Sequence, residues 1–462
     1  MSESSTKNKL LKLTESSTFQ RITKAIKNEY LFLKLVWAIC YLVSFSGCSF
    51  IIIQSFIDYF KYEVSINFSI LNDNNFEFPS VTICNINKVD YSIEGATTEI
   101  LNYLKSLNKY NETHLNDPQT IPPDLNIFDF VNSIETDTTY KPNLIKSLNN
   151  FAFSAESMIL SCYFNDQPCN QDSFYSKNLT KAKRFGKCLT FNSGYSFNGT
   201  RQDSKKSTRP GSPYGLQLKI FVGKPEHQPF WVTSLGAIVN VHNVGDAPLI
   251  IEEGATIRPG VETNLILSRQ VVKRLPEPFS NCVANVTLRD GSSSIHFNNT
   301  FSQSDNYRQK ICVNECTKAL AVEYNISIDA SLYMECLKYC PQECELTEFK
   351  LKSFVSAFPS DEYAKLIMKQ FNLNKSERNR ISSVEELRES IISLNVYFDC
   401  KDYTEIKERQ LVTFDVLLGN LGGQLGLFLG LDVLSLVEVF EFIVVAYLSV
   451  FRKKIQTTQI IK

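Results

Sequence analysis

Three acidic side chains interrupt an otherwise apolar segment near the C-terminal end of the sequence. Residues 416–450 are long enough to cross a membrane, yet they include Asp432, Glu438 and Glu441. Each acid costs about 2.5–3.5 kcal/mol at the centre of an inserting helix. These carboxylates must therefore contact water or protein, and rings of Asp or Glu in water-filled pores favour cations. The pattern predicts an ion path.

On one straight helix, the three acids cannot all point in the same direction. Successive residues turn by about 100°, so Glu438 and Glu441 lie about 60° apart and share a face with Ser435, whereas Asp432 and Glu441 lie about 180° apart. A break in the helix would restore a common direction. Gly430 is the natural place for it, because glycine tolerates backbone angles outside the helical region.

Each acid also has an alternative interpretation. Asp432 would accept hydrogen bonds from backbone amides and face away from the ions. Glu438 and Glu441 would lie near the cytoplasmic exit, where water, Arg452 or Lys453 solvates them.

Another apolar segment lies near the N-terminal end of the sequence, far from the acid-bearing one. Residues 35–57 contain no charged residue and cover the ~30 Å hydrocarbon layer at ~1.5 Å per residue. The late start and the missing small-residue cleavage site argue against a signal peptide. Basic residues precede this segment and follow the acid-bearing one, which places both ends of the chain in the cytoplasm.

These features predict a plasma membrane protein with two spans in the lipid bilayer. We expect a cytoplasmic tail (1–34), a first transmembrane helix (35–59), an extracellular cysteine-rich domain (60–410), a pre-membrane segment with the second transmembrane helix (411–450), and a cytoplasmic tail (451–462). Sequons for N-glycosylation all fall between the spans, at Asn67, Asn111, Asn178, Asn198, Asn285, Asn298, Asn325 and Asn374.

Eleven of the 13 cysteines also lie between the spans, which indicates a disulfide framework in an oxidising compartment. Cys40 and Cys48 lie in the first span and are expected to be small packing residues. Alternating patterns over 216–275 predict strands of an antiparallel sheet, with turns at 244–246 and 258–260. Residues 361–395 predict helix, and 395–400 a final strand. The extracellular domain is therefore predicted to be mixed α+β.

Several other functions do not fit the sequence. The net charge of −1 gives no indication of nucleic-acid binding. Neither His-Glu-x-x-His nor Gly-x-Ser-x-Gly occurs, so we expect no enzyme, no catalytic residue, no metal site and no cofactor. An ATP-gated trimeric channel would need a cluster of Lys and Arg for phosphates. In a non-conducting receptor, Asp432 would lie within the membrane with no water to solvate its carboxylate.

Three motifs resemble signatures of one channel family. FPSVTICNIN (78–87), GKCLTFNSG (186–194) and LLGNLGGQLGLFLGLDVLSLVEVFEF (417–442) are similar to those of the epithelial sodium channel, degenerin and acid-sensing channel family. The resemblance covers about residues 30–450 and is greatest to invertebrate peptide-gated sodium channels such as those of Hydra. It implies a trimer of homologous subunits with a palm, β-ball, finger, thumb and knuckle plan, a Na⁺ pore lined by the second spans, and block by amiloride.

The resemblance also implies specific disulfides. They are Cys84–Cys188, Cys162–Cys169, Cys282–Cys344, Cys312–Cys340 and Cys316–Cys336, and Cys400 is left without a partner. The last three pairs would form a ladder that stiffens the thumb, with Cys-x₃-Cys steps on one helical face. Any single bridge could also be a scaffold with no signalling role.

Roles in the pore follow from the same resemblance. Gly430, Leu431 and Asp432 match the selectivity belt, and Asp432 replaces the usual Ser, so we expect raised Ca²⁺ permeability or Ca²⁺ block. Ser435, Glu438 and Glu441 would line the pore or its exit. Gly419 matches a gating position at which bulk holds the pore open, although it could simply be a helix-entry glycine.

The stimulus and the subunit composition follow less directly. The N-terminal tail lacks the family's His-Gly pair, which favours an obligate partner subunit over a homotrimer. An extracellular neuropeptide is the first expectation for the stimulus, and a proton-gated or constitutively open sodium channel is the alternative.

Overall fold

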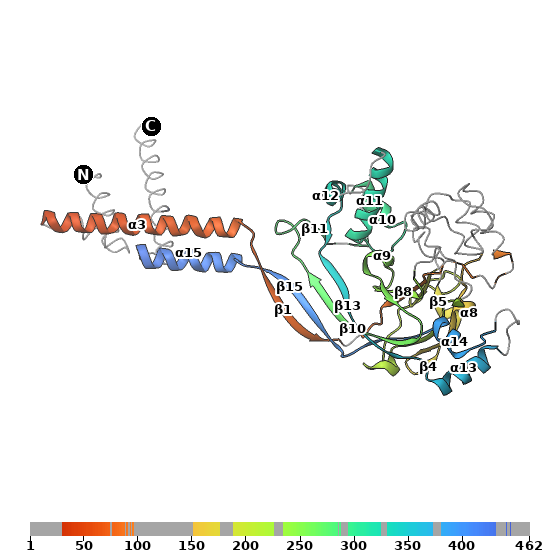
Figure 1. Ribbon diagram of the computed structural model, residues 1–462. Coiled ribbons are helices and arrows are strands. Elements are labelled where there is room, and N and C mark those ends of the chain that lie inside the picture. Colours follow the sequence, from red (N-terminus) through yellow and green to blue (C-terminus); the bar gives the residue numbers. More distant parts are fainter. Residues whose placement is uncertain are drawn as a thin grey trace, which may run out of the picture. The chain divides into compact units, whose positions relative to one another are not determined.

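The protein is described by a computed structural model, shown in Figure 1. It describes residues 30–73, 76–87, 89–90, 93, 95–96, 151–175, 188–225, 234–284, 286–287, 294–324, 330–372, 380–430, 440 and 444. The chain divides into two compact units. The helical unit is Met1–Ile66 with Glu408–Lys462, and the disulfide-rich unit is Asn67–Lys407.

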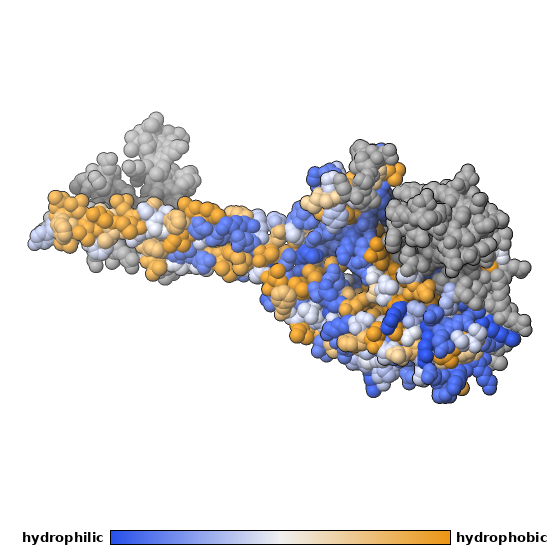
Figure 2. All heavy atoms as spheres, in the orientation of Figure 1, coloured by the Kyte–Doolittle hydropathy of each residue, from blue (hydrophilic) through white to orange (hydrophobic). Residues whose placement is uncertain are grey.

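The helical unit contains two apolar helices that pack on each other. Helix α3 (Leu31–Phe60) has 30 residues, and among the described residues it is the one helix long and apolar enough to cross a membrane. It includes the whole predicted first span. Helix α15 (Phe414–Leu429) has 16 residues and is apolar but shorter. Figure 2 shows hydrophobic side chains over much of the visible surface of both helices.

Two sheets hold most of the described strands. The larger has the order β1 (Val64–Asn72), β15 (Asp402–Gln410), β10 (Val261–Lys273), β14 (Ile391–Phe398), β7 (Leu216–Phe221), β3 (Ile159–Phe164) and β4 (Gln167–Pro168), with β13 (Glu345–Ala357) paired to β10. The smaller has the order β5 (Phe174–Tyr175), β6 (Cys188–Phe191), β2 (Ser80–Asn85), β8 (Ala237–His242) and β9 (Ala255–Ile257). Strands β11 (Cys282–Val283) and β12 (Gln342–Glu343) form a separate pair.

Short helices connect these strands. They are α8 (Ala155–Met158), η2 (Gln171–Ser173), η3 (Ser212–Tyr214), α9 (Ile250–Glu253), α10 (Ile295–Thr300), α11 (Gln309–Tyr324), α12 (Ala330–Tyr339), α13 (Asp361–Asn372) and α14 (Val384–Ser390). Ser154, Ser294 and Ser383 begin three of them by accepting a hydrogen bond from a backbone N–H of the first turn.

The core of the disulfide-rich unit follows from the strand patterns. In β10, buried and half-buried side chains alternate from Val261 to Leu267, as expected for a strand with one face on the core. Strand β14 is buried along almost its whole length, because it lies between β10 and β7 in the sheet. Phe78 is fully buried, and its ring lies 5.0 Å from that of Phe164 and 6.1 Å from that of Phe398.

The predicted strands over residues 216–275 exist, but the prediction of one antiparallel sheet is wrong. They correspond to β7, β8 and β10, and β8 belongs to the smaller sheet. Strand β10 runs parallel to β14, which separates it from β7. The alternation of side chains reports which residues face a core, but it contains no information on which strand lies next in the sheet.

The helical prediction for 361–395 is wrong at its end. Helices α13 and α14 occupy parts of it, and the backbone becomes extended from Ile391, where β14 begins. The run Ile391–Phe398 is apolar and β-branched in part, and its place in the middle of the sheet decides its conformation.

Candidate functional site

Helix α15 precedes the predicted selectivity belt and ends at its first residue. Thr413 begins the helix by accepting a hydrogen bond from Val416 N–H. Gly430 ends it with φ 66° and ψ 26°, the left-handed conformation that glycine adopts at low cost. The helix therefore ends at the residue where a break was predicted, because a straight helix cannot point all three acids in one direction. The other predicted pore residues lie outside the described residues: Leu431, Asp432, Ser435, Glu438 and Glu441.

The predicted gating residue Gly419 lies on an open face of α15. A Cβ atom built on Gly419 has no atom of the described residues within 4 Å, apart from its chain neighbours and the backbone of its own helix. The first atom of a larger side chain would therefore meet no obstacle in the described part of this subunit. An effect of bulk at Gly419 would have to come from contacts outside that part.

The opposite face of α15 packs on α3. Its less exposed residues are 417, 421, 424, 425, 428 and 429, which together make one stripe along the helix. A Cβ atom built on Gly47 of α3 would lie 3.5 Å from the ring of Phe428, so glycine lets the helices approach closely. Cys48 is 1% exposed and packs here as expected, whereas Cys40 is exposed in the single chain.

A polar contact lies within this apolar interface. The Gln424 side chain donates from Nε2 to Ser55 Oγ at 3.1 Å, and Ser55 Oγ donates to the carbonyl oxygen of Ile51 at 2.9 Å. The Cys48 thiol lies 3.9 Å from the backbone oxygen of Gln424. Gln424 is not among the residues predicted from the sequence, although an amide in an apolar helix is a signal that could have indicated it.

Five disulfides connect the disulfide-rich unit. They are Cys84–Cys188, Cys162–Cys169, Cys282–Cys344, Cys312–Cys340 and Cys316–Cys336. These are the pairs that the resemblance implied. Cys40, Cys48 and Cys400 are the free cysteines of the chain.

Two of these bridges join α11 to α12 and its end. Cys312 and Cys316 are one turn apart on α11, and their partners Cys336 and Cys340 follow the same spacing in the opposite direction. All four cysteines are buried, in a small core with Phe297 and Tyr307. The two rungs prevent the helices from sliding or separating, so they move as one body.

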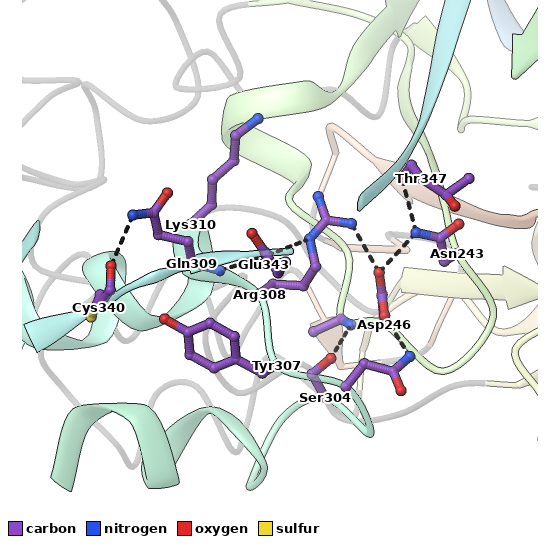
Figure 3. Close-up of polar contacts among 12 residues, drawn as sticks. Asn243, Asp246, Ser304, Tyr307, Arg308, Gln309, Lys310, Cys340, Glu343 and Thr347 are labelled. Carbon is purple, nitrogen blue, oxygen red and sulfur yellow. Dashed lines mark hydrogen bonds and ion pairs between the residues drawn. The ribbon is translucent and has the colours of Figure 1, made fainter. Parts of the chain in front are cut away.

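A buried ionic cluster lies at the base of this helix pair (Figure 3). Arg308 donates from its guanidinium to Asp246 Oδ2 at 3.0 Å, and its Nε lies 3.4 Å from Glu343 Oε1. The side chains of Arg308, Asp246 and Glu343 are 10%, 4% and 7% exposed. A buried charge is tolerated only with partners, so each member depends on the others.

Asp246 belongs to a turn that three segments hold in place. Asn306 and Asn243 donate to its carboxylate at 2.8 and 3.2 Å. Asn243 also donates to the carbonyl oxygen of Thr347 in β13 at 3.0 Å. The turn 243–247 thus connects β8 of the smaller sheet to the segment before α11 and to β13 of the larger sheet (Figure 3). We call these contacts the Asp246 hub.

His242 lies next to the hub, inside the smaller sheet. Its Nδ1 is 3.0 Å from the carbonyl oxygen of Asn243, which can only accept, so Nδ1 carries the proton. Its Nε2 then accepts from Thr82 Oγ1 at 2.8 Å. Burial lowers the pKa of His242, and the nearby Asp246 carboxylate opposes this shift.

Residues 13–442 match the family described as "Amiloride-sensitive sodium channel". The chain belongs to this family. It is 26% identical over 465 residues to acid-sensing ion channel 1 of Gallus gallus, covering 92% of this chain and 82% of that protein. It is 28% identical over 302 residues to epithelial sodium channel subunit beta of Pan troglodytes, covering 65% of this chain and 43% of that protein.

Membership in the amiloride-sensitive sodium channel family fixes the broad class of this protein. It is a membrane protein of an ion-channel family and not an enzyme. Among solved structures, a cryo-EM structure of a proton-activated chloride channel covers 90% of the chain with a TM-score of 0.34 and 9% identity. A likeness at that level carries no argument about fold or function.

The described sequons of this family member differ in accessibility. Asn198 lies on an exposed turn beside Gly199, its Oδ1 accepts from Thr200 Oγ1 at 3.1 Å, and its Nδ2 has no partner among the described residues. Asn67 is half-buried on β1 and donates to Ser69 Oγ at 3.3 Å. Asn298 is half-buried in α10. The remaining sequons lie outside the described residues: Asn111, Asn178, Asn285, Asn325 and Asn374.

Proposed function

We propose that this chain is a subunit of a trimeric, ligand-gated cation channel in the plasma membrane, with both termini in the cytoplasm. The observation that carries the proposal is the family match over residues 13–442, which includes all three acids of the acid-bearing segment. The end of α15 at Gly430 supports it, because a helix that continued straight would send Asp432 and Glu441 to opposite sides.

The ions in this proposal are Na⁺ and, to a lesser extent, Ca²⁺. Three subunits would place three copies of Asp432 near the narrowest part of the path. A ring of carboxylates attracts cations, and its charge density favours divalent ions more than a ring of Ser would. Ser435, Glu438 and Glu441 would line the wider part below, and amiloride would block the path from outside.

The proposed route from stimulus to pore uses the laddered helices α11 and α12. Because two disulfides join them, a ligand that displaces one displaces both. The Asp246 hub connects their base to β13, which pairs with β10 along 13 residues. Strand β10 in turn pairs with β15, which leads to α15.

The stimulus and the partners rest on the resemblance alone. We propose a short amidated neuropeptide as the extracellular ligand and homologous subunits as the partners. The lack of a His in the N-terminal tail supports a heteromeric assembly, because the family's His-Gly pair affects opening.

Recording from cells that express this chain tests the proposal. The chain is expressed alone and with homologous subunits, while amidated peptides and acid are applied and amiloride is added. We expect an inward current that depends on external Na⁺ and is blocked by amiloride. The proposal fails if surface biotinylation shows the chain at the cell surface in every combination and no stimulus produces such a current.

A further inference from the structure

Gln424 makes a side-chain contact that couples α15 to α3 within the helical unit. Its amide Nε2 donates to Ser55, whose hydroxyl already donates to Ile51 one turn earlier on α3. Cys48 lies two turns from Ser55 on the same face and contacts the backbone oxygen of Gln424. The contact therefore fixes both the height and the rotation of α15 against α3.

The other half of the same amide is left unsatisfied. Gln424 Oε1 is buried and has no hydrogen-bond partner among the residues that the structure describes. A buried amide oxygen without a donor is costly, whereas a hydrogen bond between membrane helices is a small gain. The Gln424 amide thus holds the helices in one orientation. That orientation is less favourable than one in which both the nitrogen and the oxygen of the amide are hydrogen-bonded.

We propose that Gln424 is a positioning residue of the channel, which sets the rotation of α15 on α3 through a contact that is weak enough to open. This inference rests on the proposed function, because the segment that α15 directs is the predicted selectivity belt. Gln424 lies six residues before Gly430, so a rotation of α15 at Gln424 changes the direction in which the chain leaves the helix.

Two substitutions that remove the same hydrogen bond should have opposite effects. Ser55→Ala removes the acceptor and leaves the whole Gln424 amide unpaired, so the helices should separate more readily. Gln424→Leu removes the bond together with the unpaired oxygen, so the helices should pack more firmly. Gln54→Leu is the matched control, because Gln54 donates to Asp58 on its own helix and to no other described residue.

The reactivity of Cys48 measures how readily the helices separate. In a Cys40→Ser/Cys400→Ser background, Cys48 is the one free thiol, since the other ten cysteines are in disulfides. Membranes with the full chain are treated with N-ethylmaleimide, and unreacted Cys48 is counted by a mass tag after denaturation. We expect labelling about threefold faster for Ser55→Ala, slower labelling for Gln424→Leu and no change for Gln54→Leu.

Two results would overturn the inference. If Gln424→Leu accelerates labelling as Ser55→Ala does, Gln424 Oε1 has a partner in the assembled protein and Gln424 only stabilises the packing of the two helices. If neither substitution changes the rate, the contact does not hold the helices.

Current recordings separate a positioning role from a merely structural one. Gln424→Leu should change the open probability and leave the single-channel conductance unchanged, because the side chain faces α3. A changed conductance would place Gln424 in the ion path and contradict the inference. If the unmodified chain carries no current in any combination, the proposed function fails, while the labelling of Cys48 still decides the positioning contact.

Discussion

Removing the Asp246 carboxylate should loosen the base of the laddered helices. Asp246 accepts hydrogen bonds from Arg308, Asn306 and Asn243, and its side chain is 4% exposed. In Asp246→Ala, the Arg308 charge stays buried, and Glu343 is its one remaining acidic partner among the described residues. Breaking a buried ion pair from one side costs about 3–5 kcal/mol.

The expected change in melting temperature follows from the size of the unit. A unit of the length of Asn67–Lys407 has an unfolding entropy of about 0.7 kcal/mol/K, so a loss of 3–5 kcal/mol lowers the midpoint by roughly 4–7 °C. Thermal unfolding of the detergent-solubilised chain measures it. Asp361→Ala is the control, because Asp361 pairs with Arg388 at the surface with 74% of its side chain exposed, and its loss should cost less than about 1 kcal/mol. Equal shifts in the two variants would refute the reasoning.

Four further predictions concern single residues. Gly419→Trp should give a resting current at unchanged surface expression, since a Cβ there meets no described atom outside its own helix and the added bulk would press on a neighbouring subunit; a resting current equal to that of the unmodified channel would contradict this. Asp432→Ser should lower the Ca²⁺-to-Na⁺ permeability ratio, measured from reversal potentials, and an unchanged ratio would speak against a carboxylate ring. Asn198→Gln should increase gel mobility by one glycan and Asn67→Gln should not, because Asn67 is half-buried and its amide is engaged; the reverse pattern would count against the argument from accessibility. Burial lowers the pKa of His242, so the contribution of His242 to stability is complete above about pH 6.5, its unfolded pKa, and is lost as the pH falls from there toward the folded pKa. His242→Gln should therefore flatten the acid dependence of the melting temperature, and an unchanged slope would exclude His242 as its source.

The parts of the fold that local pattern determines could be predicted from the sequence. The charge-free run 35–57 lies within α3, because length and composition suffice to define a membrane-length helix. The strands β7, β8 and β10 follow from alternation. Gly430 could be identified because the geometry of a helix forbids Asp432 and Glu441 from sharing a face.

Features that depend on contacts between distant segments could not be predicted. The parallel pairing of β10 with β14 joins residues more than 120 positions apart, and no local pattern records it. The same holds for the Asp246 hub, whose members Asp246, Arg308 and Glu343 look like ordinary surface charges in the sequence. Gln424 and Ser55 are separated by 369 residues, so their hydrogen bond becomes visible only when α15 lies on α3.

The central claim is that the acid-bearing segment lines a cation path, and the accessibility of position 432 tests it most directly. Asp432→Cys is introduced into a Cys40→Ser/Cys48→Ser/Cys400→Ser background and expressed in the subunit combination that carries current. A small, positively charged methanethiosulfonate reagent is then applied from outside. The account predicts that the reagent reduces the Na⁺ current and that amiloride slows the reaction. A current that persists unchanged, with position 432 unreactive in the open channel, would contradict it.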